Sequence, residues 1–540
     1  MAVAEHSKEI AKGAFWSLAG NAGVKLIAFF YLVLVARMAS QEDIGTFYLA
    51  LSIFGTLSVF ADFGFSLAFV RYTPYLISRN ETGRLFTLLK ISYTIVSLLS
   101  ILLGIVIFFA ADAISGNKPQ LAEALRLLSP YLLISMIFTM NIGFLGGKKK
   151  MKEQSVLLTF QTIAKLVLTV ALFFLIGATL FSVATAFVLS FLAALLLSLF
   201  HLKTEIAGLS ASGGGSGAME LLREVIPFGL MLSMVSYFWA LISNIDRIMI
   251  GYLLDPATST TLVAVYSMAT SLSGLIMIFP SAIAAIFLPL ISGFVGQGKK
   301  EETNAACGTS LRWMIFVTFP LALVMIAFPD SILRMFYGDS YAVGGLAMAI
   351  FTLGLLIRSI SYTQSLVLAG MRMVGIELKV VSVAALANIV LNWILIPPFG
   401  IVGSAVASAV AFAIATFLFI YYSRKIISFQ FPPEAFKAIF AGLLALALIL
   451  LVRPYVSGIL SQVPSFGEGD LALFLSKAIR LAAFGLLFLI ATAIYALALF
   501  FLKCFHPEDI GILAAALRRA KVPEDWVSGL SAFMDRGVHS

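Results

Sequence analysis

The sequence predicts an all-α integral membrane protein with about fourteen transmembrane helices, in two pseudo-symmetric six-helix lobes around a central cavity, plus two peripheral helices. The composition is the first reason: of 540 residues, 61% are hydrophobic and 12% charged, and the mean hydropathy is +1.03. Soluble globular domains do not need this much apolar surface. The second reason is a series of apolar runs of about 20 residues, the length that crosses a bilayer. The third is an internal repeat of the chain.

Fourteen runs meet the length and polarity expected of membrane spans. They cover residues 13–36, 45–70, 85–110, 127–146, 155–176, 180–201, 226–253, 262–290, 311–329, 343–369, 376–396, 400–421, 437–453 and 479–503. The first run follows a short polar start and is of full membrane length, so we interpret it as a retained helix and not as a cleaved signal peptide.

The distribution of positive charge predicts the orientation of the chain. Loops on the side of the N-terminus hold about 20 Lys and Arg, against about 5 on the other side, and cytoplasmic loops carry such an excess. One of them contains Lys148, Lys149, Lys150 and Lys152. An even number of spans places both termini in the cytoplasm. The net charge of +9 follows from this topology and needs no nucleic-acid partner.

Two stretches of the chain repeat at one constant offset. The sequence GFLGGKKKMKEQ around Gly147 corresponds to LVLAGMRMVGIE around Gly370. Thirty residues after each glycine come GATLFSVATA, starting at Gly177, and GIVGSAVASA, starting at Gly400. Spans 1–6 and 7–12 therefore look like two copies of one unit, and repeats of this kind mark many transporters.

The repeat defines the expected domains. They are an N-lobe (1–201), a flexible cytoplasmic linker with the run SASGGGSG (202–223), a C-lobe (224–421), two accessory spans (422–503) and a cytoplasmic tail (504–540). Phe47-Tyr48 and Val265-Tyr266 open the second and eighth spans, as matching landmarks. Six spans per copy is an even number, so the copies share an orientation, and we expect a binding site at their interface.

The seventh span contains the most polar stretch within an apolar run, SYFWALISNIDRIMIGYLLD (236–255). Asn244 and Arg247 fall on one helical face, and Asp246 adjoins them. A charge at membrane depth costs roughly 2.5–3.5 kcal/mol on insertion scales, so it requires a partner or a wet cavity. Two interpretations remain open here: a structural Asp246–Arg247 contact, or the wall of a cavity.

Ionisable residues inside the spans define the candidate site. They are Lys25, Asp62, Lys165, Asp246, Arg247 and Arg358. All but Asp246, which adjoins such a stripe, lie on stripes of small or polar residues, and the stripes come from both copies, as a shared central cavity requires. Four cations against two anions predict a basic cavity, which favours an anionic substrate such as a phosphate. For any single charge, a structural ion pair is an equal alternative.

No signature of catalysis or of a metal site is present in the sequence. It contains no Walker A loop, no nucleophile elbow and no paired His ligands. The histidines lie at or beyond span ends and the cysteines in predicted cytoplasmic segments: His6, His201, His506, His539, Cys307 and Cys504. We therefore expect no catalytic residue, cofactor or metal, and transport driven by an ion gradient, the membrane potential or the substrate gradient.

The chain resembles a known family over about residues 8–505. The resemblance rests on KGAFWSLAGNAGVKLIAFFYLVLVARMASQEDIGTFYLALSIF near the start, on NIDRIMIGYLLD with VAVYSMA, and on LVLAGMRMVG followed by ANIVLNWILIPPFGIVGSAVASA. These stretches are similar to the polysaccharide or oligosaccharide-lipid flippases. Their superfamily also holds the multidrug and toxic compound extrusion antiporters and the lipid II flippases. The resemblance implies fourteen helices and alternating access.

The resemblance also implies a substrate and a set of site residues. It implies flipping of a polyprenyl-pyrophosphate-linked oligosaccharide from the inner to the outer leaflet of the cell membrane, for cell-surface polysaccharide biosynthesis. By position, the resemblance assigns Lys25, Arg247, Arg358 and Lys165 to the anionic headgroup. The polar faces of the spans add Asn21, Asn244 and Asn388 as expected substrate-binding residues. Asp62 and Asp246 are candidates for coupling to H+ or Na+. Other expected partners are membrane lipid and glycan-assembly proteins.

Three other functions are alternatives to the flippase. An ion-coupled multidrug or metabolite antiporter of the same superfamily is the main alternative, and the basic interior argues against it. A membrane enzyme such as a glycan polymerase would carry a large outer loop with catalytic residues, and the short outer loops do not fit. A scaffolding protein would leave the buried charges unexplained.

Overall fold

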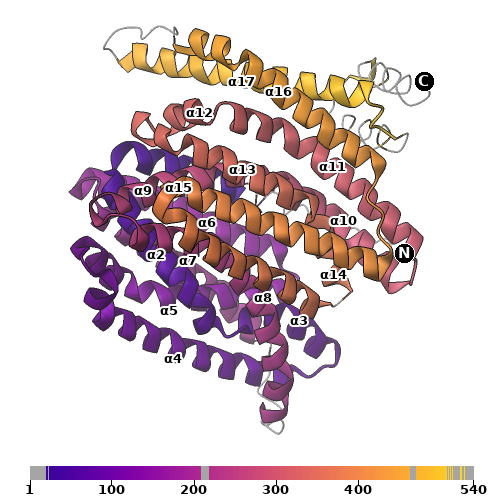
Figure 1. Cartoon of the computed structure of the whole chain (residues 1–540). Coiled ribbons are helices and arrows are strands. Elements are labelled where there is room, and N and C mark those ends of the chain that lie inside the picture. Colours follow the sequence, from indigo (N-terminus) through magenta and orange to yellow (C-terminus); the bar gives the residue numbers. More distant parts are fainter. Residues whose placement is uncertain are drawn as a thin grey trace. The chain divides into compact units, whose positions relative to one another are not determined.

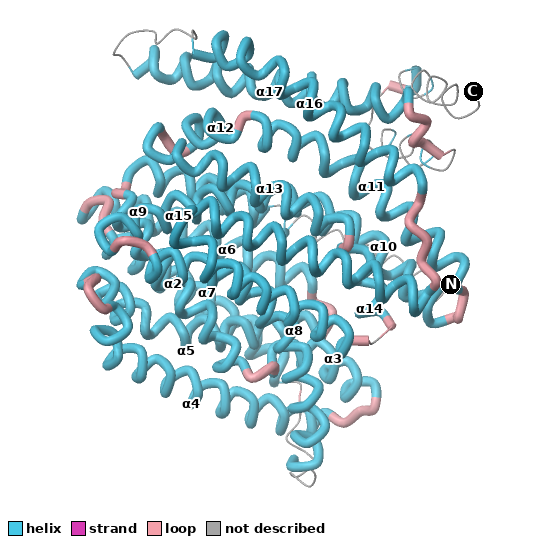
Figure 2. The backbone as a smooth tube through the Cα atoms, viewed as in Figure 1, coloured by secondary structure: helices cyan, strands magenta, loops and turns pink. Residues whose placement is uncertain are grey.

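The computed structural model describes residues 20–21, 23–207, 209, 218–371, 373–461 and 470–506, and single positions between 509 and 528. In this part of the chain the regular elements are all helices (Figure 2). Twelve of them are long and apolar enough to cross a membrane, which makes the chain a multi-pass membrane protein. One of the twelve, α15 (Val374–Ile427), covers the predicted spans 376–396 and 400–421. Residues 13–19 of the first predicted span lie outside the described residues, so the count of fourteen stays a prediction.

The helices form two compact units. The first comprises Met1–Leu272 and Val374–Ala411, and the second comprises Ser273–Met373 and Phe412–Ser540. The expected lobes and accessory spans stay predictions. The glycine-rich part of the expected linker, 210–217, lies outside the described residues.

The first unit holds the helices of the first half of the chain. They are a helical segment at 23–38, α2 (Gln41–Asp62), α3 (Phe65–Ser78), α4 (Thr82–Ser115), α5 (Pro119–Gly147), α6 (Met151–Ile176), α7 (Leu180–Ala207), α8 (Ala218–Leu253) and α9 (Pro256–Ser273) (Figure 1). Ser40 caps α2, because its Oγ accepts a hydrogen bond of 3.0 Å from the backbone N of Asp43. On α4, Leu98, Leu102 and Phe109 are exposed, as lipid-facing side chains are in a membrane helix.

Glycines let α2 and α3 approach their neighbours closely. A Cβ on Gly45 would lie 1.7 Å from the backbone O of Thr260, so only glycine fits against α9 at this point. Between α2 and α3 the chain breaks at Phe63 and Gly64, both with positive φ (50° and 86°). A Cβ on Gly64 would lie 2.3 Å from the backbone of Gly229 in α8. The predicted span 45–70 is therefore two helices that meet at an irregular turn, packed against α8.

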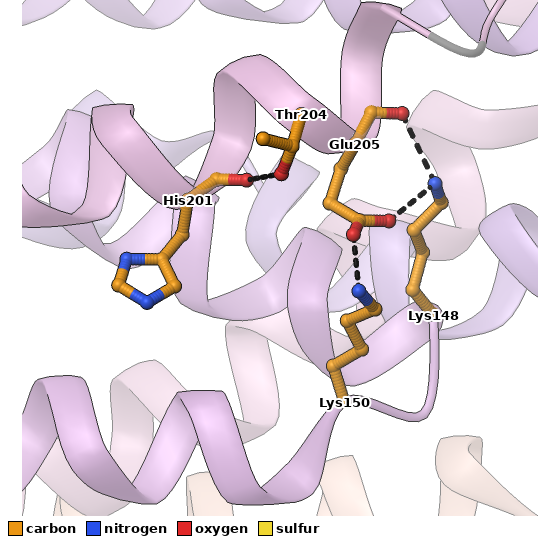
Figure 3. Close-up of polar contacts among 5 residues, drawn as sticks. All are labelled: Lys148, Lys150, His201, Thr204 and Glu205. Atoms are coloured by element: carbon orange, nitrogen blue, oxygen red, sulfur yellow. Dashed lines mark hydrogen bonds and ion pairs between the residues drawn. The ribbon is translucent and has the colours of Figure 1, made fainter.

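The basic loop between α5 and α6 is fixed to the end of α7. Lys148 Nζ lies 2.8 Å from Glu205 Oε2 and also donates to the backbone O of Glu205 at 3.1 Å (Figure 3). Lys150 pairs with the other oxygen of the same carboxylate. Lys149 between them takes positive φ, which turns the chain sharply into α6. One carboxylate thus neutralises only part of this cluster, and the loop remains net positive.

The second unit is built around one central helix, α11. Its elements are η1 (Gly274–Met277), α10 (Ile278–Gly296), α11 (Lys300–Ala327), α12 (Pro329–Phe336), η2 (Asp339–Gly344), α13 (Gly345–Ile360), α14 (Tyr362–Gly370), the end of α15, α16 (Pro433–Ser461) and α17 (Asp470–Phe501). α11 packs against α10, α13, α16 and α17, and most of its side chains are buried. The start of the tail is tied to it, since Asp509 accepts from Trp313 Nε1 at 2.9 Å and lies 3.4 Å from Arg312.

The glycine landmarks of the repeat occupy matching places along their helices. Gly147 is the last residue of α5, and Gly370 is the last residue of α14. Gly177 follows α6 with φ of 90°, and Gly400 breaks α15 with φ of 57°. In each pair a glycine ends a helix or breaks it, as expected if the two copies share one folding pattern.

Candidate functional site

Asp246 in α8 lies in a fully buried cage of hydrogen-bond donors from three helical segments. Its Oδ1 accepts from Asn392 Nδ2 at 2.7 Å and from Asn388 Nδ2 at 3.3 Å. Its Oδ2 accepts from Ser408 Oγ at 2.6 Å and from the hydroxyl of Tyr266 in α9. The two asparagines lie one turn apart in the first part of α15, and Ser408 follows its break at Gly400. Each oxygen of the carboxylate thus has two donors, all electrically neutral.

The cage around Asp246 is rich in oxygen. The amide oxygens of Asn388 and Asn392 are buried and accept no hydrogen bond from the described residues. Turning both amides over would direct these oxygens at the carboxylate. The carboxylate and the two amide oxygens would then form a cluster of oxygen ligands with one negative charge. Hard cations prefer such ligands, and a proton on the carboxylate would also be accommodated. Among the described residues no group of three or more His, Cys, Asp or Glu is placed to hold a metal.

Arg247 points away from its neighbour Asp246. The guanidinium lies 5.9 Å from the ring centre of Tyr48 in α2, and Nη1 lies 3.5 Å from Asn244 Oδ1. Its Nε is buried and has no acceptor among the described residues. Successive residues of a helix project about 100° apart, which explains why these two diverge. No ion pair joins Asp246 and Arg247 in the structure, so the expected alternative of a direct structural contact is not what holds either charge.

Lys165 in α6 lies over the other tyrosine of this region. Its Nζ is 4.2 Å from the ring centre of Tyr31, a side chain that is 2% exposed. In the described part of the chain, neither Lys165 nor Arg247 has a carboxylate within ion-pairing distance. In the first unit, two predicted site cations thus each lie over a tyrosine ring.

The other predicted residues of the first unit lie at its edge or at a helix break. Lys25 is partly buried and lies about two turns before Tyr31 on the helical segment at 23–38, and Asn21, which precedes that segment, is exposed. Asp62 ends α2, and its Oδ1 accepts hydrogen bonds from the backbone N (3.3 Å) and the hydroxyl of Ser66. The Asp62 carboxylate therefore caps the start of α3. If Asp62 also bound a coupling ion, it would have to do so while engaged in these hydrogen bonds.

Arg358 belongs to the second unit. It lies in the last turn of α13, and its guanidinium is 5.4 Å from the ring centre of Phe412. The helix breaks directly after it, at Ser361, whose backbone N and Oγ both donate to the backbone O of Arg358 at 3.1 Å. A cation at the C-terminal end of a helix is favoured by the helix dipole. A third predicted site cation thus lies over an aromatic ring.

Sequence reasoning did not assign several residues of these contacts to a site. Tyr48 and Tyr266 were noticed only as landmarks of the repeat, and Tyr31, Asn392 and Ser408 were not assigned to the site. A signal was present for two of them, because Tyr48 and Tyr266 occupy matching places in the repeat. The structure places Tyr48 beside Arg247 and Tyr266 beside Asp246.

Comparisons with known proteins identify what the chain is similar to. The family model described as polysaccharide biosynthesis protein matches residues 10–295, and the model described as MatE matches residues 230–394. A probable low-salt glycan biosynthesis flippase of Haloferax volcanii is 22% identical over 405 residues, 75% of this chain and 81% of that protein.

Among solved structures, the lipid II flippase MurJ in an inward closed conformation matches with a TM-score of 0.66 at 18% identity. The match covers 90% of this chain and 98% of that one. An inward-facing multidrug resistance transporter of the MATE family matches with a TM-score of 0.64 at 16% identity, over 75% and 94% of the two chains. At these identities the structural matches establish the fold alone.

Proposed function

Because the chain belongs to the family of polysaccharide biosynthesis proteins, whose model spans more than half of it, we propose that it is a flippase for a lipid-linked oligosaccharide. The relative from Haloferax volcanii is named as a glycan biosynthesis flippase, which supports this function. The observation that carries the proposal is the pair Lys165 and Arg247. Each lies over an aromatic ring inside an apolar helix bundle, without an ion-paired carboxylate among the described residues. An anionic headgroup supplies the negative counter-charge for these two cations.

The chemistry of the pair suits a pyrophosphate. A guanidinium donates two parallel hydrogen bonds to two phosphate oxygens, and an ammonium adds a point charge beside them. The glycan would then move through the polar interior while the polyprenyl chain stays in lipid. Transport runs from the inner to the outer leaflet of the cell membrane by alternating access, with both termini in the cytoplasm, where Lys and Arg concentrate. The protein acts as a transporter and not as an enzyme.

Asp246 is the coupling carboxylate in this proposal. Its oxygen-rich cage suits Na+ or H+, and the bound cation removes a buried negative charge next to the anion site at Arg247. Asp62 is the second candidate, but the hydrogen bonds of Ser66 already engage its carboxylate.

The alternative function is an ion-coupled multidrug or metabolite antiporter, favoured by the match to the MATE fold. Organic cations would bind best near carboxylates that are open to the cavity. Asp246 is buried among its own donors, with 1% of its surface exposed, whereas Lys165 and Arg247 are partly exposed. The accessible charges are therefore positive, which favours the flippase.

A flipping assay in proteoliposomes tests the function. Vesicles receive a fluorescent polyprenyl-pyrophosphate oligosaccharide, and a membrane-impermeant quencher then reports its transfer between leaflets. We expect transfer by the wild-type protein and not by Lys165→Ala. The matched control is Lys425→Ala, which removes an exposed lysine over Tyr421 (5.5 Å) outside the site. No transfer by the wild type, with export of organic cations instead, would favour the antiporter.

A further inference from the structure

The two tyrosines that match in the repeat contact consecutive residues of α8 in different ways. Tyr48 presents its ring to the guanidinium of Arg247, whereas Tyr266 donates its hydroxyl to the carboxylate of Asp246. We propose that Tyr48, together with Tyr31, positions the cations of the substrate site through its ring face, and that Tyr266 serves the ion site through its hydroxyl. This inference rests on the proposed function and adds positioning residues to it.

The ring faces keep the cations available for an anion. In a low-dielectric interior a carboxylate would hold Lys165 or Arg247 in a tight ion pair, and a substrate phosphate would have to displace it. The negative face of an aromatic ring attracts a cation without neutralising it. Tyr31 and Tyr48 thus stabilise two partly exposed positive charges within the helix bundle, and both charges remain free to bind a doubly or triply charged headgroup.

Two observations indicate that these tyrosines contact the cations through the ring and not through the hydroxyl. Tyr31 is 2% exposed, so a substrate cannot reach its hydroxyl, while its face touches Lys165. In the second unit the cation Arg358 lies over Phe412, which has no hydroxyl at all. The same type of contact is therefore made with a ring alone.

Tyr266, unlike Tyr31 and Tyr48, acts through its hydroxyl. Its side chain is 1% exposed, and its hydroxyl is one of the four donor groups around Asp246. Removal of the oxygen leaves Oδ2 of Asp246 with Ser408 as its remaining side-chain donor, while the ring volume is unchanged. A phenylalanine is thus expected to be harmless at Tyr48 and harmful to ion coupling at Tyr266.

Binding of farnesyl pyrophosphate to the purified full chain in detergent tests the inference, with farnesol as the uncharged control. Phe and Leu replacements are made at Tyr31 and Tyr48, and Phe at Tyr266. We expect Tyr48→Leu and Tyr31→Leu to weaken binding by about tenfold, the order that a desolvated cation–π contact supports, and the Phe variants to stay within about twofold of wild type. Tyr266→Phe should bind the probe normally and lose the dependence of flipping on Na+ or pH.

The outcomes separate this inference from the function on which it rests. The role of the ring faces is overturned if both Leu variants bind normally, or if Tyr48→Phe loses as much binding as Tyr48→Leu. In either case, binding by the wild-type protein still supports the proposed function. Wild-type protein that neither binds nor flips a pyrophosphate lipid overturns both. If a Leu variant fails to fold, judged by its thermal unfolding, the Phe variants and Tyr266→Phe still decide between ring and hydroxyl.

Discussion

Replacing Arg247 with alanine should abolish flipping and leave the protein folded. The structure gives this guanidinium little to hold in the fold: one contact of 3.5 Å to Asn244 and one ring at 5.9 Å. A cation–π contact is worth about 0.5–2 kcal/mol, and removal of a buried charge returns roughly 2.5–3.5 kcal/mol of insertion cost. The second term exceeds the first by about 0.5–3 kcal/mol, so we expect Arg247→Ala to leave the free energy of unfolding unchanged or raised by up to about 3 kcal/mol.

The effect on transport should be far larger. Arg247 would donate two charge-assisted hydrogen bonds to the headgroup, each worth about 1.5–3 kcal/mol, which corresponds to a loss of flipping of at least about 100-fold. Lysine at this position keeps the charge and loses the fork, so it should rescue only part of the rate. The measurements are the flipping rate in proteoliposomes and the thermal unfolding of the same preparations.

Two results would contradict this reasoning. Flipping by Arg247→Ala at the wild-type rate would remove the anion site at this position. A fall in unfolding temperature and membrane abundance in proportion to the lost activity would assign Arg247 to the fold instead. Lys425→Ala, the exposed cation–π control, should be normal in both measurements.

Three further predictions concern Asp246, Gly64 and the orientation of the chain. Asp246→Ala leaves four donor groups without an acceptor and should destabilise the protein by roughly 3–5 kcal/mol. Asp246→Asn should mainly remove the dependence of flipping on Na+ or pH. Unchanged ion dependence in Asp246→Asn would contradict the coupling role of Asp246. Gly64→Ala places an alanine in a left-handed backbone conformation and in a clash, and should lower the free energy of unfolding by about 2 kcal/mol or more, measured by thermal unfolding. Gly375→Ala, where a Cβ meets open space, is the control and should be near neutral. A reporter fused at Ser540 should score cytoplasmic, and an external signal would overturn the proposed orientation.

The helices and the polar faces of the site were predictable from the sequence. Apolar runs of membrane length specify helices wherever no water satisfies the backbone, so the spans emerge from composition alone. The landmark glycines Gly177 and Gly400 emerged from repetition, and both have positive φ at a helix end or break. Helical periodicity also placed Asn244 and Arg247 on one face, and the two side chains do meet.

The partners of the charges were not predictable, because they depend on packing between distant segments. Nothing local indicates that Tyr31 lies under Lys165, since 134 residues separate them. The break between α2 and α3 was also missed. Gly64 adopts a left-handed conformation and leaves no room for a Cβ beside Gly229, and an apolar run shows no sign of that contact. The sequence pattern also did not show that Asp62 caps a helix, because the start of α3, where Ser66 donates to its carboxylate, is hidden inside an apolar run.

The adjacency of Asp246 and Arg247 has a consequence for how two binding events communicate. Their Cα atoms are about 3.8 Å apart, joined by one rigid peptide plane, and their side chains diverge by about 100°. A turn of α8 about its own axis that withdraws one side chain from its partners must swing the other by the same angle. The two sites then share a single rotational degree of freedom, and thermodynamic reciprocity requires each ligand to alter the affinity of the other by the same factor. One residue inserted between them would shift their relative phase by a further 100° or so and disconnect the two sites, although every contacting side chain would still be present.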